Sequence, residues 1–250
     1  AIAPLYYYTD IFMKDAAMTG YYSSPLGYKF FHRATVNGAK EYTVCVGPKG
    51  DSYDPAINSA VDGAVVISHA FEGLYRWAQP ETGNVASTLE PGLAESYTKE
   101  AVGTEGHVKY TFKLRDNLKY SDGSDLKASD FKKSWERAAS GVLEADYGYM
   151  FDCVVGYEDC ANGVESVVPM SGVVADDTNN TLSVEIVADL PYFFELTAFP
   201  TYAPVKADVV ENGNWWTNAT TYIGNGPLKA TKIDNKDGGT LEFVPNEYYW

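Results

Sequence analysis

The residues that most often do chemistry in proteins are used sparingly in this chain. Hydrolysis by a nucleophile needs a Ser or Cys beside a His base that a carboxylate orients. His32, His69 and His107 are scattered, and the chain has no G-x-S-x-G segment. The acidic pairs, such as Glu158-Asp159 and Asp176-Asp177, are neighbours whose side chains point apart in a strand or turn. The sequence therefore predicts no enzyme and no catalytic residue.

Metal and cofactor motifs are missing from the sequence as well. There is no C-x-x-C or H-x-x-x-H spacing for zinc, and Gly224-x-Gly226 is a turn before a strand rather than a phosphate-binding strand-to-helix loop. We expect no metal and no cofactor. Cys153 and Cys160 are spaced for a short-loop disulfide if the protein is extracytoplasmic, and two unpaired, half-buried thiols are the alternative.

Charge and length limit the partners. The formal net charge of −15 argues against nucleic acid and anionic membranes, which both need a basic patch. No apolar run approaches the ~20 residues of a membrane-spanning helix. With 250 residues, 45% of them apolar, the chain can bury a large core in one domain or two smaller ones.

The elements that must position any site are clearest between residues 110 and 138. Tyr110–Arg115 alternates as a strand, a polar turn follows around Ser121-Asp122-Gly123, and a helix opens near Ser129, where Ser129 or Asp130 can cap the first amides. Phe131 and Trp135 lie four residues apart on one helix face. That spacing predicts core packing.

Other segments carry similar patterns. Tyr42–Val46 and Thr181–Ile186 alternate as strands. The apolar pattern from Val61 to Tyr75 is helix-like, and so is Pro191–Leu196.

Several short segments resemble one family in order and spacing. The segments are Asp54-Pro55-Ala56, Phe71-Glu72-Gly73-Leu74, LAESY at 93–97, YTFKLR at 110–115, YSDG at 120–123, Asn225-Gly226-Pro227 and the final PNEYYW. They resemble the LDPA, FEGL, LAESW, YTFHLR, WSDG, NGPY and LxxNPxYW segments of extracellular solute-binding proteins of family 5. Members of that family are the oligopeptide- and dipeptide-binding receptors of ABC importers.

The resemblance implies an α/β fold, namely a periplasmic-binding-protein-like type 2 lobe. We expect a mixed sheet with flanking helices and a smaller inserted subdomain. Residues 41–71 and 171–250 would form the core of lobe I, and residues 72–170 the inserted subdomain.

The start of the chain resembles the family's C-terminal end. Pro4–Thr9 and Gly20–Gly27 are similar to the tail of Gram-positive members. Residues 1–36 would then be a circularly permuted segment of lobe I, and residues 37–40 a linker in which Asn37-Gly38 favours a tight turn. A native N-terminal extension is the alternative. Under the permutation we expect residues 5–9 and 30–35 to share a sheet with Tyr42–Val46.

By resemblance, the protein binds an extracellular peptide between two lobes, largely through main-chain hydrogen bonds. Only one lobe would be present here, and the acidic partner of the peptide's amino terminus would lie in the other. The resemblance maps the first-lobe side of the cleft to Val61, Tyr147, Tyr149, Asn225, Tyr21 and Tyr22. Ordinary packing is the alternative for the tyrosines, and a turn role for Asn225.

The same resemblance implies the partners and location. These are a peptide ligand, the membrane permease of an ABC importer and no nucleic acid, for a monomer held outside the cytoplasm. The full-length parent would be lipid-anchored, with the anchor absent from this chain. Alternatives are another solute on the same fold (a metal chelate, haem or an oligosaccharide), or an interaction module that binds no solute.

Overall fold

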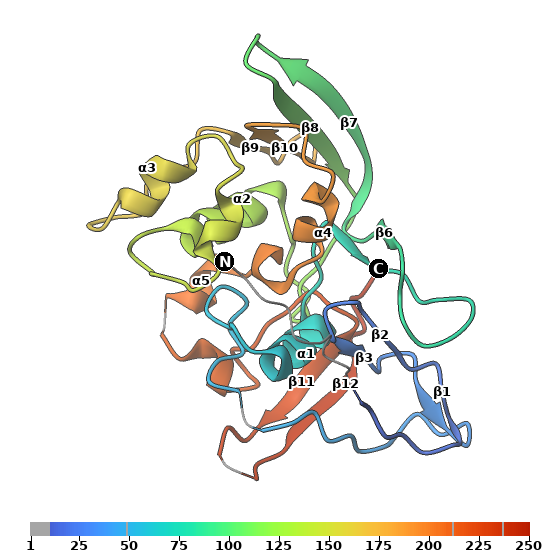
Figure 1. Ribbon diagram of the computed structural model, residues 1–250. Coiled ribbons are helices and arrows are strands. Elements are labelled where there is room, and N and C mark those ends of the chain that lie inside the picture. Colours follow the sequence, from blue (N-terminus) through green and yellow to red (C-terminus); the bar gives the residue numbers. More distant parts are fainter. Residues whose placement is uncertain (1–10, 49, 212, 237) are drawn as a thin grey trace, which may run out of the picture.

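The computed structural model describes residues 11–48, 50–211, 213–236 and 238–250 (Figure 1). Its helices are α1 (Val61–Ala70), α2 (Ala128–Ala139), α3 (Tyr157–Asn162), α4 (Phe193–Thr197) and α5 (Ala207–Val210). Short 3-10 turns lie at Gly148–Phe151, Pro200–Tyr202 and Trp215–Thr217. None of the helices in these residues is long and apolar enough to cross a membrane.

The strands pair in one four-stranded sheet and four two-stranded ones. The larger sheet has the order β7-β8-β10-β9, with β7 (Ala94–Val102), β8 (His107–Leu114), β9 (Val173–Asp176) and β10 (Thr181–Ile186). The smaller sheets are β1-β4, β2-β3, β5-β6 and β11-β12. Their strands are β1 (Met18–Thr19), β2 (Tyr22–Ser23), β3 (Lys29–Phe30), β4 (Thr35–Val36), β5 (Tyr75–Trp77), β6 (Leu89–Pro91), β11 (Leu228–Ile233) and β12 (Leu241–Pro245).

The four-stranded sheet and α2 enclose the largest core. Every second residue of β8 is buried, and Phe112 and Leu114 are fully inaccessible. Phe131 and Trp135 of α2 pack in the same core, also fully buried. The strand predicted at 110–115, the strand at 181–186, the helix opening near 129 and its core stripe are therefore confirmed.

The start of α2 shows which predicted residue caps it. The Asp130 carboxylate accepts a hydrogen bond from the Lys127 N–H at 2.9 Å, the reciprocal half of a capping box. Ser129 instead donates both its N–H and its hydroxyl to the Asp177 carboxylate, each at 2.8 Å. This pair ties the helix start to the turn between β9 and β10.

Helix α1 is shared by three smaller cores, which explains why it is apolar almost all round. Val66, Ile67 and Ala70 pack with the residues under the β11-β12 hairpin, Ala64 with the β2-β3 hairpin, and Val65 with residues around β1. The helix ends at Ala70 rather than at Tyr75, because Phe71 has extended backbone and Tyr75 begins β5.

The strand predicted at Tyr42–Val46 is wrong. Its side chains alternate between half-buried and exposed, as a strand would have them, and Tyr42, Val44 and Val46 pack beside Val65. No neighbouring strand in the described part of the chain bonds to its backbone. Alternation by itself does not make a strand, because a strand also needs a hydrogen-bonded partner. The expected partner at residues 5–9 lies outside the described residues.

Asn37 and Gly38 form the tight turn that the sequence predicts. Their φ angles are 51° and 80°, and the flanking Val36 and Ala39 exchange backbone hydrogen bonds of 3.0 and 2.9 Å. Two consecutive positive φ angles are typical of a type I′ hairpin turn.

Residues 11–36 are attached to the rest of the fold. The Phe31 N–H donates to His69 Nε2 at 2.8 Å, and the Tyr42 hydroxyl donates to the Phe31 carbonyl at 2.6 Å. The segment contributes to two of the cores on α1, so it is not a separate unit. Only short strands, β3 and β4, occur near residues 30–35, and they do not join a sheet with Tyr42–Val46.

Two features refine the expected organisation. Every strand pair in the described residues is antiparallel, because hairpins connect most of them, and the one parallel contact is the isolated bridge between Ser23 and Val85.

The sheet β7-β8-β10-β9 uses residues on both sides of residue 170, and its core extends to Tyr202. A subdomain that ended at residue 170 would cut through this sheet.

Candidate functional site

Aromatic side chains gather near the beginning of α1. Tyr147 and Tyr149 come from the 3-10 turn after α2, and the Tyr147 hydroxyl donates to the Ser59 carbonyl, 3.2 Å away. The Phe199 ring packs edge-on against Tyr147 at 5.3 Å and Tyr28 at 5.9 Å, measured between ring centroids. We call Tyr28, Tyr147, Tyr149 and Phe199 the aromatic face.

Three predicted site residues meet at this face. Val61 is the first residue of α1, two positions after Ser59, and is 47% exposed. Tyr149 is 57% exposed and its ring packs edge-on against Tyr147 at 6.2 Å. Solvent-exposed aromatic rings beside a helix start offer both apolar area and hydrogen-bonding groups to a ligand.

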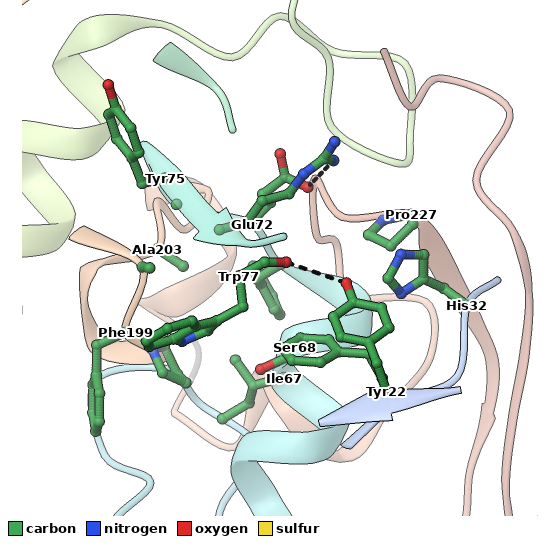
Figure 2. Close-up of a pocket in the computed structure, with 16 residues that line it drawn as sticks. Tyr22, His32, Ile67, Ser68, Glu72, Tyr75, Trp77, Phe199, Ala203 and Pro227 are labelled. Atoms are coloured by element: carbon green, nitrogen blue, oxygen red, sulfur yellow. Dashed lines mark hydrogen bonds and ion pairs between the residues drawn. The ribbon is translucent and has the colours of Figure 1, made fainter. Parts of the chain in front are cut away.

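A cavity of about 40 Å³ lies beside the aromatic face (Figure 2). We call it the Trp77 cavity. Phe199 lines both the cavity and the face, and the Tyr22 hydroxyl donates to the Trp77 carbonyl at 3.3 Å at its wall. His32, Ser68, Glu72 and Arg76 also line the cavity.

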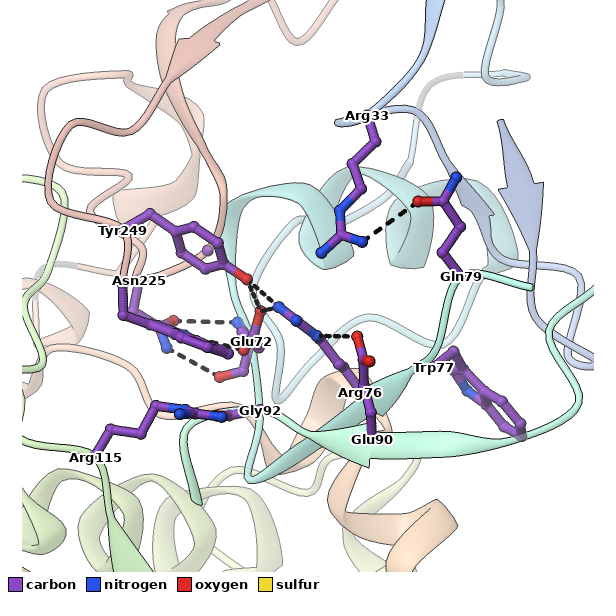
Figure 3. Close-up of polar contacts among 12 residues, drawn as sticks. Arg33, Glu72, Arg76, Trp77, Gln79, Glu90, Gly92, Arg115, Asn225 and Tyr249 are labelled. Carbon is purple, nitrogen blue, oxygen red and sulfur yellow. Dashed lines mark hydrogen bonds and ion pairs between the residues drawn. The ribbon is translucent and has the colours of Figure 1, made fainter. Parts of the chain in front are cut away.

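A cluster of polar groups around the buried Glu72 adjoins this cavity, which Glu72 and Arg76 line (Figure 3). Arg76 pairs with Glu72 at 3.3 Å and with Glu90 at 2.8 Å, and its guanidinium also bonds the Tyr249 hydroxyl. The Tyr249 hydroxyl donates to Glu72 at 2.5 Å, and Trp250 Nε1 donates to the same carboxylate at 3.2 Å. Burial raises the pKa of Glu72 above its ordinary value, although Arg76 and the hydrogen bonds from Tyr249 and Trp250 act in the opposite direction.

The Trp250 ring is held by two cations. The Arg115 guanidinium lies 3.8 Å from the ring centroid and the Arg76 guanidinium 4.8 Å from it. Arg115 also donates to the Gly92 carbonyl at 2.7 Å. Cation–π contacts of this kind fasten Trp250 to β5 and to the residue after β8.

Asn225 lies inside the fold. It is 2% exposed, its amide donates to the Glu72 carbonyl at 2.9 Å, and its oxygen accepts from the Glu72 N–H at 3.3 Å. The side chain thus pairs with the backbone just after α1, as the turn alternative predicted.

We expect Asn225→Ala to lower the free energy of unfolding by about 2 kcal/mol, because it leaves two buried backbone groups of Glu72 unpaired. Denaturant unfolding of both proteins checks this. Asn218→Ala is a suitable control, since Asn218 bonds only within an exposed turn. An unchanged midpoint for Asn225→Ala would contradict the structural role.

Tyr21 and Tyr22 are adjacent at the start of the β2-β3 hairpin, and their rings pack in two different cores. Tyr22 is 3% exposed, lines the Trp77 cavity and stacks on Phe30 at 4.7 Å. Tyr21 stacks on Phe12 at 4.7 Å and lines a second, open hollow of about 380 Å³. Neither ring belongs to the aromatic face.

The sequence reasoning missed Tyr28, Trp77 and Phe199. No short motif surrounds them, and the hairpins β2-β3 and β5-β6 bring two of them to the site from distant parts of the chain. A hint was present in the many aromatic residues, 20 of them Tyr, but their number cannot say which ones meet.

The expected disulfide is absent from the structure. Cys153 and Cys160 are free, buried thiols, and Cys160 Sγ donates to the Glu136 carbonyl at 3.4 Å. Burial raises the pKa of each of these thiols to about 11. Within the described residues no group of three or more His, Cys, Asp or Glu side chains is arranged to hold a metal ion.

Comparison with known proteins gives consistent matches. Residues 88–250 match the family model "Bacterial extracellular solute-binding proteins, family 5 Middle". The chain is 35% identical to the oligopeptide-binding protein OppA of Bacillus subtilis over 195 residues, covering 77% of this chain and 33% of that protein. It is 32% identical to the periplasmic murein peptide-binding protein MppA of Escherichia coli over 203 residues, covering 80% and 35%.

Solved structures agree with the sequence matches. The substrate-binding domain of an oligopeptide ABC transporter from Bacillus anthracis aligns with a TM-score of 0.70 at 30% identity, over 81% of this chain and 37% of that chain. This similarity confirms the predicted α/β class and the type 2 binding-protein fold. The chain spans about a third of the length of the relatives it matches.

Proposed function

Because the chain belongs to the bacterial extracellular solute-binding proteins of family 5, we propose that it is part of the substrate-binding component of an ABC importer and binds peptides. The observation that carries the proposal is the match to OppA and MppA, whose names describe oligopeptide and murein peptide binding. Binding without turnover is part of the proposal, so a bound peptide should be recovered intact.

We place the peptide on the aromatic face. Helix α1 begins at Val61 and its N-cap residue, Ala60, makes no side-chain cap, so the first N–H groups of the helix are left to bond water or a ligand carbonyl. The exposed ring of Tyr149 and the half-buried ring of Tyr147, which is bonded to the Ser59 carbonyl just before α1, offer stacking area. An extended peptide offers the same backbone whatever its sequence, which suits a site with few side-chain demands.

The resemblance implies that the peptide is held between two lobes, and residues 1–250 would supply the contacts of one of them, so the affinity of this segment by itself should be low. Half of the contacts would be missing, together with the closure that excludes water. The remaining assignments are proposals of the same kind. They are an importer permease as partner, a monomeric state, and a location outside the cytoplasm with a lipid anchor on the full-length parent.

We expect the chain to bind tripeptides weakly, and Tyr149→Ala to weaken that binding about three- to tenfold, the effect of losing one aromatic contact. Chemical-shift titration of the ¹⁵N-labelled chain measures the affinity, and native mass spectrometry with a mixed peptide pool identifies retained peptides.

Tyr192→Ala is the matched control, since Tyr192 is 53% exposed but belongs to the start of α4. Equal affinities for the two variants would contradict the placement on the aromatic face. If the chain binds no peptide but binds a metal chelate, haem or an oligosaccharide, the result would favour the alternative that the fold serves another solute. No binding to any of these would favour an interaction module, and hydrolysed peptide would revive an enzyme.

We also propose that residues 1–36 are a circularly permuted segment of the lobe. The packing of residues 11–36 on α1 supports this, because the segment completes two cores of the lobe. If so, the peptide link at residues 37–40 is dispensable for the folded state. After cleavage at a protease site placed between Gly38 and Ala39, both pieces should elute together on gel filtration. Release of the short piece would favour a native extension.

A further inference from the structure

Two residues that line the Trp77 cavity carry buried hydrogen-bonding atoms that no described residue satisfies. Trp77 is only 8% exposed, and its Nε1–H has no acceptor; Nδ1 of His32 is likewise buried without a partner. Both residues line the cavity (Figure 2). Because an unpaired buried donor is costly, such atoms are ordinarily matched by water or by a ligand.

The size of the cavity limits what can match them. One water molecule needs roughly 10–15 Å³ of cavity volume. A cavity of about 40 Å³ therefore holds a few waters or a group of about three heavy atoms. An aromatic or long aliphatic side chain does not fit this space.

The charges around the cavity limit the ligand further. Arg76 pairs with Glu72 at 3.3 Å and with Glu90 at 2.8 Å, so each of these charges already has a partner. Burial lowers the pKa of His32 to about 3, so that ring is neutral at pH 7. A charged group entering here would lose its hydration without gaining a free counter-charge. Ser68 donates its hydroxyl to the Ala64 carbonyl at 2.7 Å and keeps its oxygen lone pairs as acceptors.

The cavity adjoins the aromatic face through Phe199, which belongs to both. We propose that the Trp77 cavity takes a small neutral side chain of a bound peptide, of the size of Ser, Thr or Asn, whose oxygen accepts a hydrogen bond from Trp77 Nε1–H. The inference rests on the proposed function, because the peptide must lie on the aromatic face. Trp77 is then a specificity-determining residue of the site.

The cavity can be probed without a peptide. The chain has five tryptophans, so the ¹⁵N-labelled protein gives at most five indole N–H signals, and Trp77→Phe identifies that of Trp77. If that variant does not fold, nuclear Overhauser contacts to Tyr22 and Phe199 identify the signal instead. Acetamide, a small neutral amide, should move the Trp77 signal saturably. The signal of Trp135, which already donates to the Tyr202 carbonyl at 2.8 Å, should stay in place.

Xenon provides the opposite probe, because it enters dry apolar cavities. A Trp77 signal that responds to xenon but not to acetamide would overturn the proposal. A uniform drift of all indole signals with acetamide would overturn it too, since that is a solvent effect. Ser68→Ala should weaken the acetamide response but leave the fold intact.

Two isosteric peptides complete the test. Ala-Thr-Ala should bind the wild-type chain roughly three- to tenfold more tightly than Ala-Val-Ala, and Trp77→Phe should abolish this preference. Equal affinities of the wild type for both peptides would overturn the specificity role and leave the proposed function standing. Acetamide binding without binding of either peptide would support the cavity's ligand class and count against the proposed function.

Discussion

Asp54→Asn is expected to lower the free energy of unfolding by about 3–5 kcal/mol, the usual effect of breaking a buried ion pair from one side. Asp54 is 0% exposed, and its two carboxylate oxygens accept from Arg137 at 3.0 and 2.6 Å. Trp215 Nε1 donates to it at 2.9 Å, and so does the Ala56 N–H at 2.9 Å. An amide in this position cannot accept all these bonds, and its NH₂ group would face other donors.

The loss should be visible as a fall in melting temperature of roughly 6–20 °C for a chain of this size. Lys206→Ala is the control, because the ion pair of Lys206 with Asp122 is partly exposed and should contribute less than about 1 kcal/mol. The double variant Asp54→Leu/Arg137→Met should recover only part of the stability, since both charges are then removed but Trp215 Nε1–H and the Ala56 N–H lose their acceptor. A loss of under 1 kcal/mol in Asp54→Asn would show that the pair does not hold the fold.

Gly224→Ala should cost about 3 kcal/mol, the upper range of overpacking effects. A Cβ on Gly224 would lie 1.9 Å from the Ala70 carbonyl oxygen and 2.8 Å from its carbon. Both are backbone atoms at the end of α1, so no rotamer change relieves the contact. The neighbouring Gly226 N–H donates to the same carbonyl at 2.8 Å, which fixes the two segments against each other.

Gly103→Ala is the control that distinguishes the effect of this steric contact from the effect of replacing a glycine as such. Gly103 has a φ of 61°, and a Cβ there meets nothing within 4 Å, so only backbone strain of about 1 kcal/mol is expected. Denaturant unfolding of both variants gives the comparison. If Gly103→Ala proved as destabilising as Gly224→Ala, the close approach to Ala70 would not be the cause.

The sequence predicted elements well where the information is local. The core stripe of Phe131 and Trp135 requires only helical spacing, and the turn at Asn37-Gly38 requires only two residues that tolerate positive φ. Tyr42–Val46 has an equally clear alternation but no hydrogen-bonded neighbour in the described part of the chain. Pairing depends on a distant segment, which a local pattern cannot show.

The predictions for the candidate site divide in the same way, into residues that the sequence could indicate and residues that only the folded chain reveals. The family resemblance pointed to Val61, Tyr147 and Tyr149, and the structure brings these together. It also pointed to Asn225, whose side chain the structure pairs with the backbone of Glu72. Trp77 could not be found in advance, because its importance depends on a missing acceptor and an adjacent cavity, and both exist only in the folded chain.

The shared position of α1 has a consequence for how the protein opens. Its side chains belong to three cores at once, so none of these cores can come apart without disturbing the same ten-residue helix. Opening of this half of the protein should therefore be a single cooperative event. The backbone amides of α1 would then exchange with deuterium only as fast as this whole half unfolds.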